Sequence, residues 1–262
     1  MLNITIVGAS GRMGQSILSL ARDMESVQIV GAVVRPGSSV ENQPVPGWDA
    51  LRYSSDLDAA VSAADVVLDF SAPGPRDRLA KACAEHGRAL LVGTTGLDAE
   101  AQAQLKAQAD RIPVLLAPNT SLGVNQLVDL VRRTAAALGE QYDIEILEAH
   151  HGRKQDAPSG TALRLGDAAA DGRGQSLESV AVHARQGQTG PREPGAIGFS
   201  VVRGGDIAGE HTVMFAGPGE RIELTHRASS RDTFARGALD AARWLASGRA
   251  PGLYGMNDVL GA

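Results

Sequence analysis

The first strand, turn and helix constrain the fold of this chain more than any other feature. Residues 4–7 (Ile-Thr-Ile-Val) form a β-rich run, residues 15–24 have a helical pattern, and residues 27–34 form a second strand candidate. The turn between the first strand and the helix reads Gly8-Ala9-Ser10-Gly11-Arg12-Met13-Gly14. A strand, a glycine-rich turn, a helix and a second strand in this order predict a βαβ unit.

The glycine-rich turn predicts nucleotide binding. Its glycines are spaced G-x-x-G-x-x-G, and Ser10 stands where the usual G-x-G-x-x-G fingerprint has its second glycine. Glycines permit a tight turn and a close approach of the backbone to a pyrophosphate, while the helix N-terminus offers N–H groups and a positive dipole. A plain tight turn into a helix is the alternative, but the βαβ context favours a dinucleotide.

The end of the second strand predicts which dinucleotide binds. An acidic residue about 20 positions after the glycines would bind the ribose 2′-OH of NAD. Val34 occupies that position, and Arg35 follows it. Because an arginine suits a 2′-phosphate, the sequence favours NADP. The alternative is that Arg35 is a solvated residue that opens the turn at residues 36–39.

Further apolar strands alternate with helices in the first half. Strand candidates lie at residues 65–70, 89–92 and 114–117, with helices at 76–86 and 98–110. Fully apolar strands covered by helices predict a parallel sheet, in which ligands bind beyond the carboxyl ends of the strands. The loops 70–73, 93–96 and 117–120 lie at that edge. Their Thr and Asn side chains could contact nicotinamide or substrate, or could cap the next helices.

The second half has a different pattern. After a helix at residues 124–138, alternating strand candidates appear at 143–150, 180–184, 199–201, 212–215 and 220–228. Ala216-Gly217-Pro218-Gly219 predicts a hairpin turn, and one clear helix, 161–170, interrupts the strands. The long loop 186–195 could cover a ligand or reach another subunit. An amphipathic helix at 233–247 is expected to return to the first domain.

The expected architecture is therefore α/β. Residues 1–121 with 231–262 should form a Rossmann-like dinucleotide-binding domain with a parallel sheet. Residues 122–230 should form an α+β domain with a mixed or antiparallel sheet.

The segment from Glu148 to Thr161 contains the candidate catalytic group. Two adjacent histidines, His150 and His151, precede Lys154, and Ser159-Gly160-Thr161 after Pro158 looks like the start of a helix. An imidazole, a fixed positive charge and free backbone N–H groups could bind an anion and pass it a proton. An ordinary solvated loop is the alternative. A metal site is less favoured, because no third ligand lies at a recognisable spacing.

Composition narrows the class of protein. The 262 residues are 43% hydrophobic and carry a net charge of −5, with no basic, aromatic-rich patch, so nucleic acid is not an expected partner. No apolar run approaches the roughly 18 residues of a membrane span. We expect no signal peptide, and we expect the single Cys83 to be a buried structural thiol. These features are typical of a cytoplasmic enzyme.

Several motifs together resemble one family, the 4-hydroxy-tetrahydrodipicolinate reductases, formerly called dihydrodipicolinate reductases, of lysine and diaminopimelate biosynthesis. The resemblance runs from residue 4 to about residue 259. The motifs that carry it are the glycine-rich turn, Gly93-Thr94-Thr95-Gly96, Glu148-Ala149-His150-His151 with Lys154, Asp156-Ala157-Pro158-Ser159-Gly160-Thr161, Arg203-Gly204-Gly205-Asp206-Ile207 and Gly209-Glu210-His211-Thr212. It implies cytoplasmic hydride transfer from NADPH or NADH to a cyclic dicarboxylate. It also implies a homotetramer built through the sheet of the second domain.

The resemblance also implies roles for individual residues. His150 would donate the proton and Lys154 would be the second donor, while His151, Ser159, Gly160 and Thr161 would bind substrate. The cofactor residues would be Gly8, Ala9, Ser10, Gly11, Arg12 and Met13 at the pyrophosphate, Arg35 at the 2′-phosphate, and Gly93, Thr94, Thr95, Ala117, Pro118, Asn119 and Thr120 at the nicotinamide. No metal ligand is implied.

The chain departs from this family at two positions. Many members have a glutamate where this chain has Val34, and the family often has an aromatic residue where this chain has Thr120. We expect NADPH to be preferred, with NADH possible. Two other hypotheses remain: another two-domain NADP-dependent reductase, such as an amino-acid dehydrogenase, and a non-catalytic dinucleotide sensor.

Overall fold

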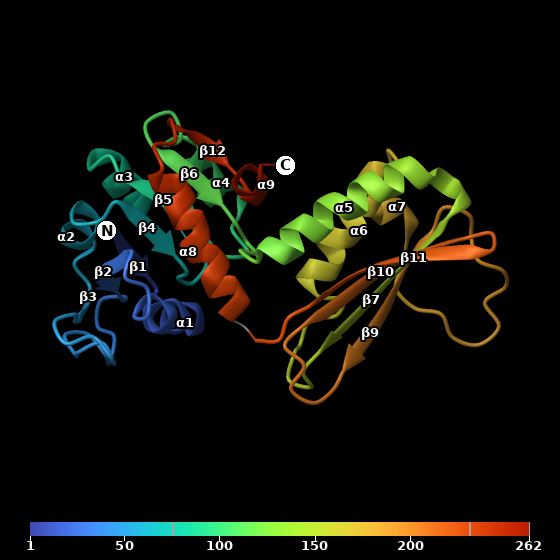
Figure 1. Cartoon of the computed structure of the whole chain (residues 1–262), viewed down its shortest axis with the longest axis horizontal. Helices are drawn as coiled ribbons and strands as arrows, with labels where there is room; N and C mark the ends of the chain where they lie inside the picture. Colours follow the sequence, from blue (N-terminus) through green and yellow to red (C-terminus); the bar gives the residue numbers. More distant parts are fainter. Residues whose placement is uncertain (75, 231, 262) are drawn as a thin grey trace. The chain divides into compact units, whose positions relative to one another are not determined.

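The computed structural model describes residues 1–74, 76–230 and 232–261. The chain divides into two compact units (Figure 1). The first unit combines Met1–Leu122 with Asp232–Ala262, and the second is Gly123–Arg231.

The first unit is built on a seven-stranded sheet in the order β12-β6-β5-β4-β1-β2-β3. All neighbouring strands in this sheet are parallel, which confirms the predicted Rossmann-like sheet. The strands are β1 Leu2–Val7, β2 Val27–Val33, β3 Tyr53–Ser54, β4 Val66–Asp69, β5 Ala89–Val92, β6 Pro113–Leu116 and β12 Gly252–Tyr254.

Helices cover both faces of this sheet. They are α1 Arg12–Ala21, α2 Leu57–Ser62, α3 Asp77–Glu85, α4 Ala99–Lys106, α8 Asp232–Ala246 and α9 Met256–Leu260. On one face, α1 and α8 lie side by side and bury Ile17 and Leu239 against Ile4 of β1 (Figure 1). On the other face, α2, α3 and α4 bury a second apolar cluster. Two covered faces explain why the central strands β5 and β6 are apolar along their whole length.

Cys83 belongs to the second of these clusters and is fully buried. Burial, with a contribution from the negative charge of Asp69, raises the pKa of its thiol to about 12. The thiol therefore stays protonated, which confirms the prediction of a buried structural cysteine.

Several boundaries in the first unit differ from the sequence prediction. Helix α1 was expected over residues 15–24, but it begins at Arg12 and ends at Ala21. It therefore begins inside the glycine-rich turn. The short elements β3, α2, β12 and α9 were missed, because two to six residues are too few to show a periodic pattern.

The second unit contains a mixed five-stranded sheet in the order β11-β10-β7-β9-β8. Its strands are β7 Asp143–His150, β8 Ala181–Val182, β9 Ile197–Arg203, β10 Glu210–Gly217 and β11 Glu220–Arg227. Strand β7 pairs antiparallel with β10 and parallel with β9. The predicted mixed sheet and the hairpin between β10 and β11 are both confirmed.

Two helices cover one face of the second sheet. Helices α5 Leu122–Leu138 and α6 Gly160–Gly172 bury Leu127 and Leu165 with Ile144, Ile146 and Phe215 of the strands. A Cβ on Gly172 would lie 2.3 Å from the Arg132 carbonyl oxygen, so glycine lets the two helices approach closely. The short helix α7 Leu177–Val180 was not predicted, and the strand expected at 180–184 is shortened to β8.

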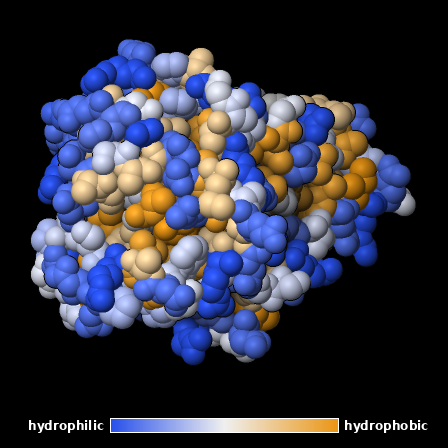
Figure 2. All heavy atoms as spheres, turned by 60° about the vertical axis from the view of Figure 1, so that its left-hand side comes forward, coloured by the Kyte–Doolittle hydropathy of each residue, from blue (hydrophilic) through white to orange (hydrophobic). Residues whose placement is uncertain are grey.

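Among the described residues, no helix is long and apolar enough to cross a membrane. Figure 2 shows one face of the molecule, on which hydrophilic residues surround smaller hydrophobic patches.

Candidate active site

The glycine-rich turn has a geometry that larger residues would not allow. Gly8 has a φ of 82°, and a Cβ added there would lie 2.6 Å from the Phe70 carbonyl oxygen. A Cβ on Gly14 would lie 2.5 Å from the Gly8 carbonyl oxygen. Gly11 is the N-cap of α1 and has no side chain to cap the helix. The start of α1 is therefore suited to bind an anion such as a pyrophosphate.

A cavity of about 490 Å³ lies on one side of this turn, at the ends of β1 and β2. Its walls include Gly8, Ser10, Gly11 and Arg35, as the sequence predicted. They also include polar residues that the sequence analysis missed, namely Ser38, Ser55 and Arg78. Within the described parts of the chain, no side chain forms a hydrogen bond or ion pair with the guanidinium of Arg35 or Arg78.

A carboxylate that the sequence spacing does not reveal lies beside this cavity. Glu41 accepts a hydrogen bond from the Gly37 N–H at 2.8 Å, and its other oxygen accepts one from the Ser55 hydroxyl. These bonds, that of Ser55 first, lower the pKa of Glu41. Both oxygens are therefore engaged in holding the turn that carries Arg35.

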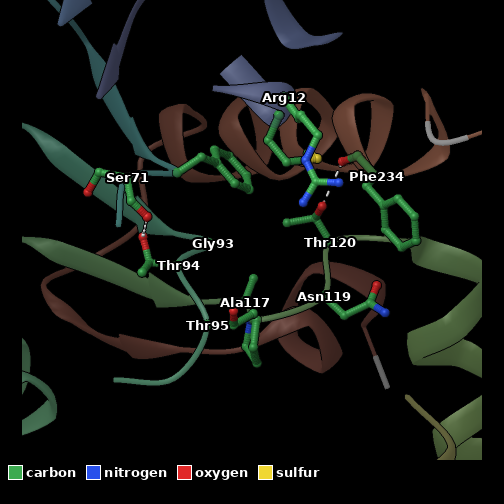
Figure 3. A pocket seen from close by; sticks show the side chains of 12 residues that line it. Arg12, Ser71, Gly93, Thr94, Thr95, Ala117, Asn119, Thr120 and Phe234 are labelled. Atoms are coloured by element: carbon green, nitrogen blue, oxygen red, sulfur yellow. Dashed lines mark hydrogen bonds between the residues drawn. The ribbon is translucent and has the colours of Figure 1, made fainter. Parts of the chain in front are cut away.

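A second cavity, of about 320 Å³, lies at the ends of β4, β5 and β6 (Figure 3). All of its lining residues belong to the first unit. The predicted residues that line it are Arg12, Met13, Gly93, Thr94, Thr95, Ala117, Pro118, Asn119 and Thr120. Phe70, Ser71 and Phe234 complete the walls. Phe234 comes from α8, far along the chain, so no local pattern could have indicated it.

Two predicted cofactor residues have structural contacts of their own. Ala9 is fully buried, and its N–H donates to the Val33 carbonyl at 3.0 Å. The hydroxyl of Thr120 donates to the Phe234 carbonyl at 2.6 Å (Figure 3). A Cβ on Gly237 would lie 1.9 Å from the Thr120 carbonyl oxygen, so the loop after β6 lies directly against α8.

The candidate proton donor lies in the second unit, at the end of β7. Alternate residues of this strand, Ile144, Ile146, Glu148 and His150, are buried, which confirms that His150 shares the face of the two isoleucines. The Nδ1 atom of His150 lies 2.6 Å from Oε2 of Glu148. With Nδ1 held in this way, Nε2 is the nitrogen that can exchange a proton with a ligand.

Glu148 is the centre of a hydrogen-bonded network. Arg203 donates to both of its carboxylate oxygens, each at 2.8 Å, and the Ser159 N–H donates to Oε1 at 2.9 Å. Burial raises the pKa of Glu148, but the hydrogen bonds from Arg203, His150 and Ser159 outweigh burial and lower it overall. The carboxylate is therefore ionised at neutral pH.

His211 lies against this network. Its ring meets that of His150 edge to face, with centroids 5.1 Å apart, and its Nε2 lies 3.1 Å from the Ser159 hydroxyl oxygen. Burial, with a contribution from the charge of His150, lowers the pKa of His211 to about 4. His211 is therefore neutral near pH 7. Beside it, a Cβ on Gly209 would lie 3.1 Å from Nε2 of His150, so a glycine keeps this nitrogen uncrowded.

The predicted anion site adjoins the same network. Ser159 is the N-cap of α6 and accepts a hydrogen bond from the Ala162 N–H at 3.2 Å, so Gly160 and Thr161 form the first turn. Lys154 forms an ion pair with Asp156 at 2.9 Å, a partner that the sequence analysis missed. Arg203 also donates to the Asp156 carbonyl at 2.7 Å. The structure thus connects the segments of His150, Lys154 and Ser159 through Glu148 and Arg203.

His151 follows the end of β7 and is half-buried, and its N–H donates to the Ile207 carbonyl at 2.8 Å. In the portion of the chain that the structure describes, no group of three or more His, Cys, Asp or Glu could hold a metal ion.

Family models match both halves of the chain. The model for the dihydrodipicolinate reductase N-terminus matches residues 2–120, and the model for the C-terminus matches residues 123–260. The chain belongs to the dihydrodipicolinate reductase family. Relatives named 4-hydroxy-tetrahydrodipicolinate reductase from Thiobacillus denitrificans and Alkalilimnicola ehrlichii are 49% and 50% identical to it. Those matches cover 99% and 98% of this chain and 98% of each relative.

Solved structures share the fold. The dipicolinate-bound dihydrodipicolinate reductase from Paenisporosarcina sp. TG-14 has a TM-score of 0.76 and 23% identity, over 98% of this chain and 99% of that one. A probable dehydrogenase from Thermotoga maritima has a TM-score of 0.63 and 12% identity, over 98% and 92%. Family membership confirms the resemblance seen in the motifs and makes the protein an oxidoreductase that uses NADH or NADPH.

The lowered pKa of His211 predicts a pH dependence of stability. The unfolded chain binds a proton at this residue below about pH 6.5, whereas the folded chain does so only near pH 4. Because the unfolded state binds more protons in this window, the free energy of unfolding should fall as the pH decreases from about 6.5 towards 4. At about pH 5 the loss due to His211 should be roughly 2 kcal/mol.

Chemical unfolding of the wild type and of His211→Gln between about pH 7.5 and 5 measures this loss, which should be absent from the variant. His226, which pairs with His211 across the β10–β11 ladder and has a pKa lowered by burial, adds a smaller dependence that both proteins retain. Protonation of Glu148 lowers the free energy of unfolding only below its unfolded pKa of about 4.5, outside this pH range. The exposed His183→Gln is the control, and equal slopes for all three proteins would contradict the prediction.

Proposed function

We propose that this protein reduces 4-hydroxy-tetrahydrodipicolinate to tetrahydrodipicolinate with NADPH or NADH, as a step of lysine and diaminopimelate biosynthesis. The observation that carries the proposal is the Glu148-bound His150 beside the start of α6, in a chain of this family. A non-catalytic dinucleotide sensor would need no such proton donor beside an anion site.

The substrate's two carboxylates need two anion sites. The N–H groups of Gly160 and Thr161, at the positive end of α6, are proposed as one site, with Ser159 and His151 as further substrate contacts. The ammonium of Lys154 is proposed as the other. Its present partner, Asp156, has a side chain that is 59% exposed, so water can solvate this carboxylate when substrate takes the lysine.

The reaction requires a hydride and a proton, and the 4-hydroxyl group of the substrate leaves as water. The bound nicotinamide supplies the hydride. His150 is proposed to deliver the proton from Nε2, because Glu148 binds Nδ1 and stabilises the protonated ring. Arg203 keeps that carboxylate in place with two parallel hydrogen bonds, and Lys154 assists as a second donor.

The cavity beside the glycine-rich turn supports a preference for NADPH. Arg35 is available for a 2′-phosphate, and hydroxyls of Ser38 and Ser55 with the guanidinium of Arg78 lie in the same walls. The preceding residue, Val34, is apolar and buried. Glu41, the first acidic residue after Val34, has its carboxylate held by hydrogen bonds from Gly37 and Ser55.

The enzyme is proposed to be a cytoplasmic homotetramer. The open face of the second sheet supports the tetramer. Helices cover the face that holds Ile144 and Ile146, so Leu147 and Ala149 of β7 point to the opposite face. Val202 is paired with Ala149 and shares this face. Leu147 and Val202 are 39% and 55% exposed. Exposed apolar side chains on an uncovered sheet are typical of a subunit interface.

The reaction and the role of His150 are tested together. Following NADPH absorbance with the cyclic substrate, His150→Gln should lower kcat by about 10²–10⁴ and leave the NADPH affinity nearly unchanged. The exposed His183→Gln is the matched control. Lys154→Ala should raise KM for the substrate, lower kcat and weaken competitive inhibition by a pyridine dicarboxylate, whereas the neighbouring exposed Arg153→Ala should not. A His150→Gln enzyme with more than about a tenth of wild-type kcat would exclude a general acid at this position.

Cofactor preference is tested at Arg35. Charge-assisted hydrogen bonds contribute about 1.5–3 kcal/mol, so the wild type should prefer NADPH by about ten- to a hundredfold in kcat/KM. Exposure and salt favour the lower value. Arg35→Ala should weaken NADPH use and spare NADH, and Val34→Glu should shift preference towards NADH. Lys81→Ala removes an exposed positive charge from the same unit and should change neither ratio. Equal use of both cofactors, unaltered by Arg35→Ala, would refute this role.

The tetramer is tested by sedimentation. The wild type should sediment at four times the monomer mass, and Val202→Glu, which places a charge on the open face, should reduce that mass. Leu253→Glu is the control, because Leu253 is a 45% exposed apolar residue of β12 in the other unit. A monomeric wild type would contradict the assembly without affecting the proposed reaction.

A further inference from the structure

A buried ion pair lies at the carboxyl edge of the first sheet. Asp69 is the last residue of β4, is fully buried, and pairs with Val7 and Val92 of the two neighbouring strands. The Nε atom of Arg76 lies 2.6 Å from its Oδ2 atom, and the arginine side chain is only 6% exposed. Neither residue was singled out by the motifs of the sequence.

Arg76 and Asp69 together hold the loop that follows β4. The guanidinium donates to the carbonyls of Ala72 at 2.7 Å and Gly74 at 2.9 Å. Oδ1 of Asp69 accepts hydrogen bonds from the N–H and the hydroxyl of Ser71 at 3.0 and 2.6 Å. The loop is thus bound at three residues, Ser71, Ala72 and Gly74, to one pair of side chains.

The same pair reaches the loop that follows β5. The Thr94 hydroxyl lies 3.3 Å from Oδ2 of Asp69 and donates to the Ser71 carbonyl at 3.2 Å (Figure 3). Between these loops, the ring of Phe70 packs so closely on Gly93 that a Cβ there would lie 2.1 Å from it. Phe70, Ser71, Gly93 and Thr94 are neighbouring walls of the 320 Å³ cavity.

An ordinary stabilising salt bridge is the alternative interpretation. The cost of desolvating two charges offsets much of their attraction, so a buried pair is weak evidence of stabilisation. The side-chain contacts of Asp69 and Arg76 described above all lie within or between the two loops that line one cavity. Their arrangement therefore fits a role in fixing the geometry of that cavity.

We propose that Asp69 and Arg76 are positioning residues that fix the nicotinamide within the 320 Å³ cavity by holding the loops after β4 and β5. This inference rests on the proposed function, because it takes the 320 Å³ cavity to be the nicotinamide site. The pair touches neither cofactor nor substrate. It acts through Phe70, Ser71 and Thr94, and it has no part in reading the 2′-phosphate.

Four variants test the pair. Arg76→Met keeps the length of the side chain and removes its hydrogen bonds, and Arg76→Lys keeps the charge but cannot reach both carbonyls at once. Asp69→Asn removes the negative charge. The double variant, Asp69→Asn with Arg76→Met, leaves no unpaired buried charge. The matched control is Arg88→Met. Arg88 donates to the Ser62 carbonyl at 2.7 Å and precedes β5, at the amino edge of the same sheet.

Misplacement of the nicotinamide has a specific kinetic signature. Arg76→Met should lower kcat/KM by about ten- to a hundredfold for NADPH and NADH alike, leaving their ratio unchanged. The primary isotope effect with 4-deuterated NADPH should rise as hydride transfer becomes slower. Arg76→Lys should be intermediate. The double variant should recover Tm relative to Arg76→Met, because no charge is left unpaired, but it should not recover kcat/KM.

The control separates positioning from stability. Arg88→Met should lower Tm and leave KM and the isotope effect at wild-type values. The inference is overturned if Arg76→Met, or Arg76→Lys should the former not fold, behaves like Arg88→Met. A wild type that does not oxidise NADPH with the cyclic substrate would refute the proposed function instead. Fluorescence titration with NADPH would then still test the pair, since weaker binding to the Arg76 variants supports it and unchanged binding overturns it.

Discussion

The candidate site of the second unit depends on the hydrogen bonds that surround the buried carboxylate of Glu148. An ionised carboxylate away from water is costly unless donors surround it, and here the donors come from three separate segments. Arg203 belongs to β9, Ser159 precedes α6, and His150 lies two residues along β7. Satisfying one charge therefore fixes His150, the start of α6 and the end of a neighbouring strand relative to one another. The lowered pKa of Glu148 shows that these donors outweigh the effect of burial.

The first unit uses the same physical principle at its own sheet edge. Asp69 is a fully buried carboxylate at the end of β4, and its partner Arg76 binds the loop that follows. In both units, the charge lies at or near the end of a strand, close to the loop that follows it. Loops have few apolar contacts of their own, so a buried charge with several hydrogen bonds is an effective way to hold them in one conformation.

Close backbone approach is the second constraint on the first unit. Gly14 lets α1 lie against the turn at Gly8, and Gly237 lets α8 lie against Thr120. The two helices pack side by side on one face of the sheet. The return of the C-terminal segment therefore supplies Phe234 to the cavity and a partner for the Thr120 hydroxyl. A compact residue at position 120 fits this close contact with α8.

Sequence alone determined the class of fold and the order of its main elements. Periodicity and turn chemistry are local, so the apolar strands, the glycine-rich turn and the alternation of residues 143–150 could be interpreted without coordinates. The motif at His150 and Lys154 is also local, and it predicted a proton donor beside an anion site. Only the tertiary structure decided which groups satisfy the buried charges. These groups include the partners of Glu148 and Asp69 and the donors to Glu41. Like Phe234 in the cavity wall, they are distant in sequence or unremarkable in pattern. Hydrogen-bond partners of this kind are set by packing and desolvation in three dimensions, and no local pattern encodes them.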